Sequence, residues 1–369
     1  MDAASEYRAQ GEPDKSSHLW KYTPWRKVHP TGKIDEIPEF GEPALKLTTI
    51  DSEDTPEGVR LSREEGFTTI NQQDDLLTSN FLIAASSGNS YTLEVDSGFT
   101  SDNPVMLEID VGNTPTVLHL HLELGSRSNI ELVTKIVGSS DWFGFMRTGQ
   151  IGSASIVNDV VINLVDSGTV LRSDSIIIGR DAQVRAGTIS SGSERTKADL
   201  RFQMGERGGN LRVLGSVMSA EKMHLDHHIE IHHAAPETFS RLSWHSACGG
   251  ESRTVGTGML RVAEGSQGAD AGQIFHNLLL SPKAEADSIP ELEVMENEVV
   301  GCGHGTANGP IDEQQLFYLE SRGYDSADAK RALIAAFLNS TLSEMGTEKL
   351  HHWLVDMLSQ ELEGLYEQT

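Results

Sequence analysis

The sequence is poor in cysteine, in aromatic residues and in positive charge. Its 369 residues include two cysteines, Cys248 and Cys302, which are too few for a disulfide framework and indicate a reducing compartment. Aromatic residues make up 6%, while 35 glycines favour short strands joined by tight turns over a helix bundle. The chain has 29 Lys and Arg and 55 Asp and Glu, so its net charge is -26. Such a surface repels phosphate backbones, and we therefore expect no nucleic-acid partner.

Several targeting and catalytic signals are also missing. No apolar run approaches the roughly 20 residues that span a bilayer, and the polar, acidic start from Met1 to Ser17 does not resemble a signal peptide. We therefore expect a cytoplasmic chain with no membrane partner. There is no Walker-A loop, no Gly-x-Ser-x-Gly elbow and no Cys-x-x-Cys pair, so we expect no nucleotide to be bound by this chain.

The central part of the chain alternates apolar and polar residues with a period of two. In residues 118–124 four leucines alternate with His119, His121 and Glu123. Such runs predict half-buried strands, with one face inward and one outward. Long helical stretches are missing here, and parallel strands without helical crossovers are typical of solenoids. The loosely repeated phrases at 124–130 and 178–184 support a parallel β-helix, with a β-sandwich as the alternative.

These patterns predict three parts of the chain. Residues 1–80 form an irregular N-terminal segment with an aromatic cluster, Trp20 to Trp25, which we expect to pack on the main body. Residues 81–310 form the β-helix core, and residues 311–369 form a C-terminal α-helical region.

The C-terminal region carries clear helix signals. Asp312 is a candidate N-cap of the first helix, with Gln315 completing a capping-box pattern. A second helix is predicted to start near Asp325-Ser326, and a third after Thr347. The third helix has a wide apolar stripe from Leu350 to Leu365, which would either pack on the end of the solenoid or dock a partner.

A histidine-rich strand is predicted at residues 224–233. Alternation places one polar row on a single face of it: Asp226, His228, Glu230 and His232. Imidazole and carboxylate groups suit zinc, iron or manganese, so a β-helical metal-dependent enzyme that uses this row is an alternative function. A solvated polar face would give the same pattern.

A second constellation is Cys302 and His304, two residues apart in a glycine-rich stretch. Thiolate and imidazole are ligands of iron–sulfur clusters, but a closed site needs about four ligands. A site here must therefore take ligands from elsewhere in the chain, from another chain or from sulfide. The alternative is a cysteine that only packs, and this is also the favoured interpretation of Cys248.

Several motifs together resemble the SufB/SufD family of iron–sulfur cluster assembly scaffold proteins. They are Trp20-Lys-Tyr-Thr23, Ile231-His-His-Ala-Ala-Pro236, Asn277-Leu-Leu-Leu280, Ala286-Asp-Ser-Ile-Pro290, Cys302-Gly-His-Gly-Thr306 and Leu316-Phe-Tyr-Leu-Glu-Ser-Arg-Gly323. Within the family, the Cys302-Gly303-His304-Gly305 sequence is similar to SufD-type chains. SufB-type chains carry a core cysteine and a glutamate where Phe275 and Gly303 stand here.

The resemblance implies a right-handed parallel β-helix and a non-catalytic subunit of an ATP-driven assembly complex. The partners implied are a SufB-like subunit, or a second copy of this chain, and a SufC-like ABC ATPase. It also implies a nascent iron–sulfur cluster that is transient and shared with the partner, with His304 and Cys302 at the subunit interface. The ATPase is expected to dock on the C-terminal helices through Leu316, Phe317, Tyr318, Leu333 and Phe337. A purely structural subunit, in which Cys302 and His304 are inert, stays open as a further alternative.

Overall fold

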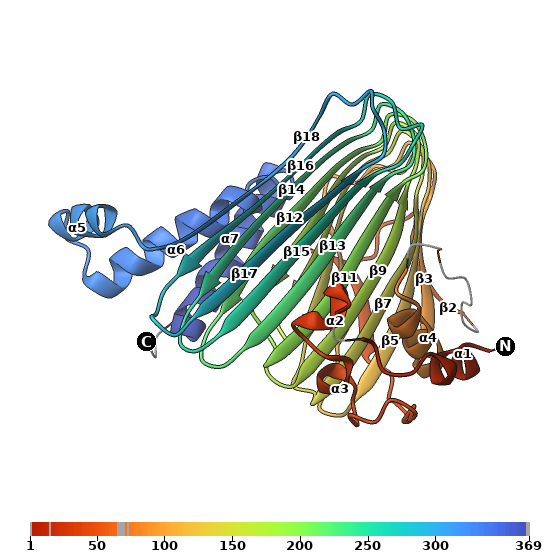
Figure 1. Ribbon diagram of the computed structural model, residues 1–369, viewed down its shortest axis with the longest axis horizontal. Helices are drawn as coiled ribbons and strands as arrows, with labels where there is room; N and C mark the ends of the chain where they lie inside the picture. Colours follow the sequence, from red (N-terminus) through yellow and green to blue (C-terminus); the bar gives the residue numbers. More distant parts are fainter. Residues whose placement is uncertain (1, 15, 65–70, 72–73, 367–369) are drawn as a thin grey trace.

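The main body is a parallel β-solenoid made of two facing nine-stranded sheets (Figure 1). The computed structural model describes residues 2–14, 16–64, 71 and 74–366. In order, sheet I contains β1 (Ala44–Thr49), β4 (Val105–Asp110), β6 (Asn129–Val137), β8 (Ile156–Asn163), β10 (Gln183–Ser190), β12 (Asn210–Ser219), β14 (Phe239–Cys248), β16 (Asp270–Leu279) and β18 (Gly301–Pro310). Sheet II contains β2 (Val59–Glu64), β3 (Ser90–Val95), β5 (Thr116–Leu124), β7 (Trp142–Ile151), β9 (Thr169–Ile178), β11 (Arg195–Met204), β13 (His224–His233), β15 (Arg253–Val262) and β17 (Glu285–Val294).

From β3 to β18 the chain crosses from one sheet to the other after every strand, so each of these strands pairs with the next strand but one. From β3 onward these pairs are parallel and in continuous register, which confirms the predicted parallel β-helix over the β-sandwich. The two ends of the solenoid differ. One end is finished by β1 and β2, which pair antiparallel to β4 and β3. At the other end β17 and β18 have no further strand beside them among the described residues. We call this the open end.

The solenoid interior is apolar along most of its length but contains one buried ionic layer. Leucines of β5 and β6 face inward as the period-two pattern predicts. Arg147 lies in this interior and contacts Asp159 at 2.6 Å and Asp174 at 2.9 Å, while Arg172 also contacts Asp174 at 2.6 Å. All four side chains are buried, so their opposite charges offset the loss of hydration.

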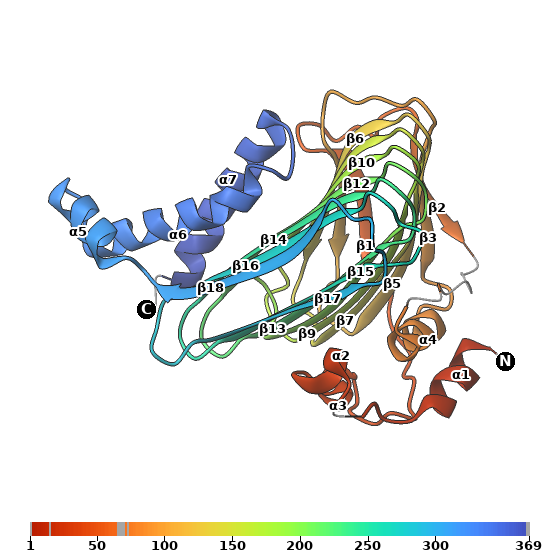
Figure 2. The ribbon, with the colours of Figure 1, turned by 45° about the horizontal axis from the view of Figure 1, so that its top comes forward.

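The C-terminal region forms three helices, α5 (Glu313–Ser321), α6 (Ser326–Leu342) and α7 (Glu348–Tyr366). Helices α6 and α7 cover the outward face of sheet I (Figure 2). Asp312 caps α5 as predicted, and Asp325 caps α6, which begins where the second helix was expected to start. The side chains of both residues accept backbone N–H groups of the first turn. The α7 stripe packs against the outward face of sheet I and not on the end of the solenoid; the side chain of Leu365 lies outside the described residues. The central strands of this sheet are therefore buried on both faces, where the sequence predicted half-buried strands.

The N-terminal segment lies across the outward face of sheet II, on the opposite side of the solenoid (Figure 2). It contributes α1 (Ala3–Gln10), α2 (His18–Lys21), α3 (Trp25–Val28) and α4 (Leu76–Ala85). The aromatic cluster packs on the main body as expected, with Trp20 and Trp25 buried. The boundary expected at residue 80 falls inside α4. The segment before it is also not separate from the solenoid, since β1 and β2 already belong to the two sheets. In the part of the chain described, we find no helix with the length and apolarity needed to traverse a bilayer.

Candidate functional site at the open end

Cys302 and His304 lie on the last strand of the solenoid and face its interior. They are in register with Ala271 and Gln273 of the neighbouring strand β16. In-register residues of parallel strands point to the same face, and both Ala271 and Gln273 are buried in the interior. On β18, which lies beyond β16 at the open end, Cys302 is half-buried against the core and His304 is exposed. The structure therefore brings the predicted pair together at a surface.

The floor beneath this pair is closed by side chains of the rung below. The Phe275 ring occupies the space above Gly258, where a Cβ atom would lie 2.9 Å from the ring. The Gln273 amide reaches across the interior, and its Nε2 donates to the carbonyl of Glu291 at 2.8 Å. The amide of Asn277 donates to Ser288 and Asn308, each at 2.7 Å. The route to His304 therefore leads from the open end.

The ligand set at the open end is incomplete. Burial, the largest cause, raises the pKa of the Cys302 thiol above its ordinary value, so the free chain holds it protonated at neutral pH. A cluster would need that thiol deprotonated and would need about two further ligands. Thr306 and Asn308 continue the same inward row, a grouping that follows from the alternation of β18 but that sequence reasoning missed.

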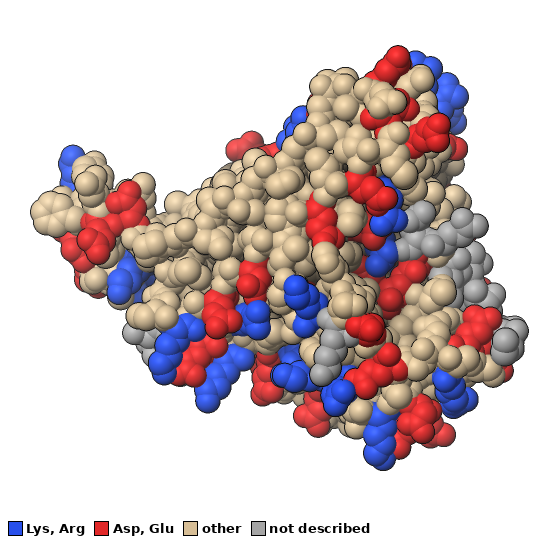
Figure 3. Space-filling view, in the orientation of Figure 1, with Lys and Arg blue, Asp and Glu red and all other residues tan. Residues whose placement is uncertain are grey.

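The two edge strands of the open end differ in charge, since β17 carries four acidic residues and β18 carries none. Strand β18 contains no charged residue. Figure 3 shows the surface along β18 free of charged side chains, which gather along its lower border instead. Apolar side chains are exposed at the turn that joins β17 to β18, with Met295 52% and Val300 74% exposed.

The predicted polar row of β13 is present on one face of the strand, but it is not solvated. Asp226, His228 and Glu230 are all buried. Thr23 donates a hydrogen bond of 2.5 Å to Asp226, and the Lys197 ammonium group contacts the same carboxylate at 3.0 Å. The interpretation as a solvated polar face is therefore wrong, because the N-terminal segment covers this end of the row.

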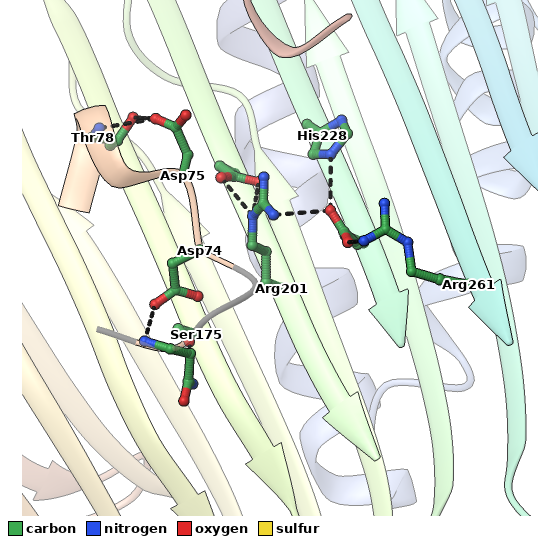
Figure 4. Close-up of polar contacts among 10 residues, drawn as sticks. Asp74, Asp75, Thr78, Ser175, Arg201, His228 and Arg261 are labelled. Atoms are coloured by element: carbon green, nitrogen blue, oxygen red, sulfur yellow. Dashed lines mark hydrogen bonds and ion pairs between the residues drawn. The ribbon is translucent and has the colours of Figure 1, made fainter. Parts of the chain in front are cut away.

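Glu230 is engaged by arginines (Figure 4). Arg201 contacts it at 2.9 Å and Arg261 at 3.4 Å, while the Nε2 atom of His228 lies 3.8 Å away. Burial, the largest cause, raises the pKa of Glu230, but the hydrogen bond from His228 and the positive charge of Arg201 outweigh it and keep that pKa below its ordinary value. The carboxylate is thus charged and already paired.

A metal ion finds no ready site in this row. His232 lies four residues along the strand from His228, about 13 Å away at the usual rise per residue. Within the described residues no group of three or more His, Cys, Asp or Glu side chains is arranged to hold a metal ion. Metal binding by His228, Glu230 and His232 stays an untested prediction. Cys248 is buried with its sulfur 3.0 Å from the Thr254 hydroxyl.

The expected docking residues fall into two groups. Helix α5 has no buried residue, with Phe317 71% and Tyr318 55% exposed and Leu316 half-buried beside them. Leu333 and Phe337 lie half-buried on α6, and the Phe337 ring stacks on His245 of sheet I at 4.7 Å. Only the α5 group projects away from the solenoid.

Comparison with known proteins assigns the family. A family model described as "SUF system FeS cluster assembly, SufBD core domain" matches residues 112–337. The chain belongs to the SufBD core family. The motifs of the sequence indicated the same family.

Individual SufBD relatives support the assignment. An iron–sulfur cluster assembly SufBD family protein of Mycobacterium leprae is 28% identical over 55% of this chain and 53% of its own length. A SufBD family protein of Mycobacterium tuberculosis is 30% identical over 50% of this chain and 49% of its own length. The iron–sulfur cluster assembly protein SufD of Escherichia coli is 26% identical over 52% of this chain and 45% of its own length. The chain thus spans about half the length of these relatives.

Proposed function

We propose that this chain is a SufD-like, non-catalytic scaffold subunit of an ATP-driven iron–sulfur cluster assembly complex. Its open end pairs with a SufB-like subunit, or with a second copy, and its α5 helix contributes to docking a SufC-like ABC ATPase. The cargo is a nascent iron–sulfur cluster that is held transiently between two subunits. A cytoplasmic location is part of the same proposal.

The observation that carries this proposal is the position of Cys302 and His304. Both side chains face the interior of the last rung, and no rung lies above them among the described residues. A second solenoid placed on the open end would supply the missing wall and the missing ligands of a cluster site. The SufD resemblance rests on the Cys302-Gly303-His304-Gly305 sequence and on the E. coli SufD match.

Docking of the ATPase is supported by the exposed aromatic side chains of α5. Two adjacent rings on a helix that buries nothing of its own are typical of an interface. The metal-dependent enzyme that uses the β13 row receives no such support, because Glu230 is paired to Arg201 and Arg261.

Purification of the tagged chain from its native host tests the proposed complex. We expect a SufB-like chain and an ABC ATPase to copurify at fixed stoichiometry, and we expect the complex to acquire iron and sulfide under reducing conditions. A chain that purifies alone from its host, with no family member and no ATPase, would contradict the proposal.

A further inference from the structure

The outward face of sheet I contains a polar pocket that the C-terminal helices leave uncovered. Near the middle of their strands, Val133, Val160 and Leu214 belong to the apolar cluster that α6 and α7 bury. The residues that precede them on β6, β8, β10 and β12 form the floor of a pocket of about 630 Å³. The loop at residues 100–102 and Thr347, directly before α7, also line this pocket.

Three arginines stand side by side on this face. Arg185, Arg212 and Arg241 are in register on β10, β12 and β14. In-register residues of neighbouring strands are about 4.8 Å apart in the backbone, and like charges there repel each other. Arg212 is paired with Glu344 at 2.7 Å, and Arg241 with Asp270 at 2.9 Å. The exposed Arg185 has no ion-pair partner in the part of the chain that the structure describes, although acidic residues outnumber basic ones by 55 to 29.

Two carboxylates line the same pocket, but neither neutralises Arg185. Glu131 already accepts the N–H of Thr347 at 2.6 Å, the hydroxyl of Thr347 at 2.8 Å and the amide of Asn158 at 2.9 Å. Asp102 lies on the loop that leads into β4, which β6 and β8 separate from β10, so its backbone is more than about 10 Å from that of Arg185. Exposed charges at that distance are largely screened at about 0.1 M salt. The field beside Arg185 is therefore positive in spite of the acidic chain.

A row of amide side chains lines the pocket beside the arginines. Asn129, Gln183 and Asn210 share one register row on β6, β10 and β12, with the partly exposed Ile156 of β8 between the first two. Among the described residues, none of the three amides makes a side-chain hydrogen bond. The row lies two residues, or about 7 Å, along the strands from the arginines. Amides both donate and accept hydrogen bonds, so they suit the hydroxyl groups of a ligand.

We propose that this pocket binds a small phosphorylated molecule that carries hydroxyl groups. Its phosphate lies between Arg185 and Arg212, and its hydroxyl groups bond to the amide row. Planar guanidinium groups bind the oxygens of a phosphate in pairs. The pair of Arg212 with Glu344 is about half exposed and contributes little, so it does not hold Arg212 away from a ligand. The inference is independent of the cluster site, because neither Cys302 nor His304 lines this pocket.

Calorimetric titration of the full chain tests the pocket and the class of ligand. The probes are glucose 6-phosphate, inorganic phosphate and glucose, at constant ionic strength. We expect glucose 6-phosphate to bind saturably at one site per chain, inorganic phosphate to bind roughly tenfold more weakly, and glucose to give no measurable binding. Equal affinity for the two phosphate compounds would assign a site for free phosphate and overturn the proposed class. Absence of saturable binding by either compound would overturn the site itself.

Single substitutions locate the binding of glucose 6-phosphate. We expect Arg185→Met to weaken it by roughly tenfold or more, because a charge-assisted hydrogen bond is lost. Asn210→Ala should weaken glucose 6-phosphate several-fold and leave inorganic phosphate unchanged. Arg180→Met, at an exposed arginine outside the pocket, is the matched control and should stay within about twofold of wild type. Thermal unfolding checks that each variant folds. If folded R185M binds as wild type does, or if R180M loses as much affinity, the phosphate does not lie at Arg185.

Discussion

His304 stands in register with Gln273 on the neighbouring strand, yet the two side chains occupy different environments. Gln273 is 1% exposed beneath the last rung, whereas His304 is exposed at the surface of the open end. The interior of the solenoid thus ends between them. This border explains why a thiol and an imidazole that are too few for a cluster site lie side by side at a surface.

The exposed aromatic pair on α5 should matter for the ATPase and not for folding. We expect the double variant F317S/Y318S to unfold at the wild-type temperature, because neither ring is buried, and to lose most of its capture of the ABC ATPase. Ile156→Ser is the matched control, since Ile156 is an exposed apolar side chain on β8. Undiminished ATPase capture by F317S/Y318S would exclude α5 as a docking element.

The buried ionic layer should be sensitive to the loss of one partner. Arg147→Met leaves Asp159 and Asp174 in the interior with less compensating charge, and we expect unfolding in denaturant to show a loss of about 3–5 kcal/mol. The control is Arg60→Met, which breaks an exposed ion pair with Asp96, and its stability should match wild type. Equal stabilities for the two variants would show that the layer contributes little.

The anchor of the N-terminal segment on β13 should contribute measurably to stability. Thr23→Val removes the hydrogen bonds to Asp226 and to His224, at 2.5 and 2.8 Å, and leaves the buried carboxylate with Lys197. We expect a loss of about 1–3 kcal/mol in the free energy of unfolding. Thr55→Val, at an exposed hydroxyl that donates to the carbonyl of Leu47, should stay within about 0.5 kcal/mol of wild type. A T23V protein as stable as T55V would refute the anchor.

Buried neutral histidines should make the fold sensitive to acid. Burial lowers the pKa of His119 and of His227 to about 3 each. Unfolded histidine titrates at about pH 6.5, so the unfolded state binds more protons below that pH. The contribution of these two neutral histidines to the free energy of unfolding is therefore complete above about pH 6.5. It is lost progressively as the pH falls toward about 3, and at about pH 5 the free energy of unfolding is lower by about 2 kcal/mol per histidine.

His227→Leu isolates one of these contributions. The imidazole packs against the Trp244 ring at a tilt of 49°, with ring centroids 5.1 Å apart, so an apolar residue of similar volume can replace it. Denaturant unfolding at neutral pH and at about pH 5 should show an acid-induced loss for H227L that is smaller than the wild-type loss by about 2 kcal/mol. If the acid-induced loss of unfolding free energy were the same in both proteins, His227 would not take up a proton on unfolding.

Local signals in the sequence were sufficient where the structure depends on local physics. Asp312 and Asp325 cap their helices because a carboxylate needs only the next two or three N–H groups. The two faces of β13 follow from the alternation of a strand, which the sequence predicted for residues 224–233. Cys302 and His304 lie on the same face of β18 because they are two residues apart on a strand. The period-two runs and repeated phrases indicated the solenoid, and the SufB/SufD motifs added the family.

The remaining features depend on contacts that the order of residues does not encode locally. Thr23 meets Asp226 across 203 residues of sequence, which is why the β13 row could not be recognised as covered. The period-two pattern of sheet I says nothing of α7, which buries the face that should have met solvent. To predict that the interior ends between Gln273 and His304, one must know how many rungs the solenoid has. The irregular repeat in the sequence does not give that number.

The most direct test of the account is cluster formation by the purified complex with His304→Ala. The variant removes an exposed side chain, so the complex should assemble normally, and we expect the yield of reconstituted cluster, followed by absorbance and iron content, to fall by roughly tenfold or more. His352→Ala, at an exposed histidine of α7, serves as the control and should match wild type. An intact H304A complex that forms clusters at the wild-type yield would contradict the claim that the open end contributes to the cluster site.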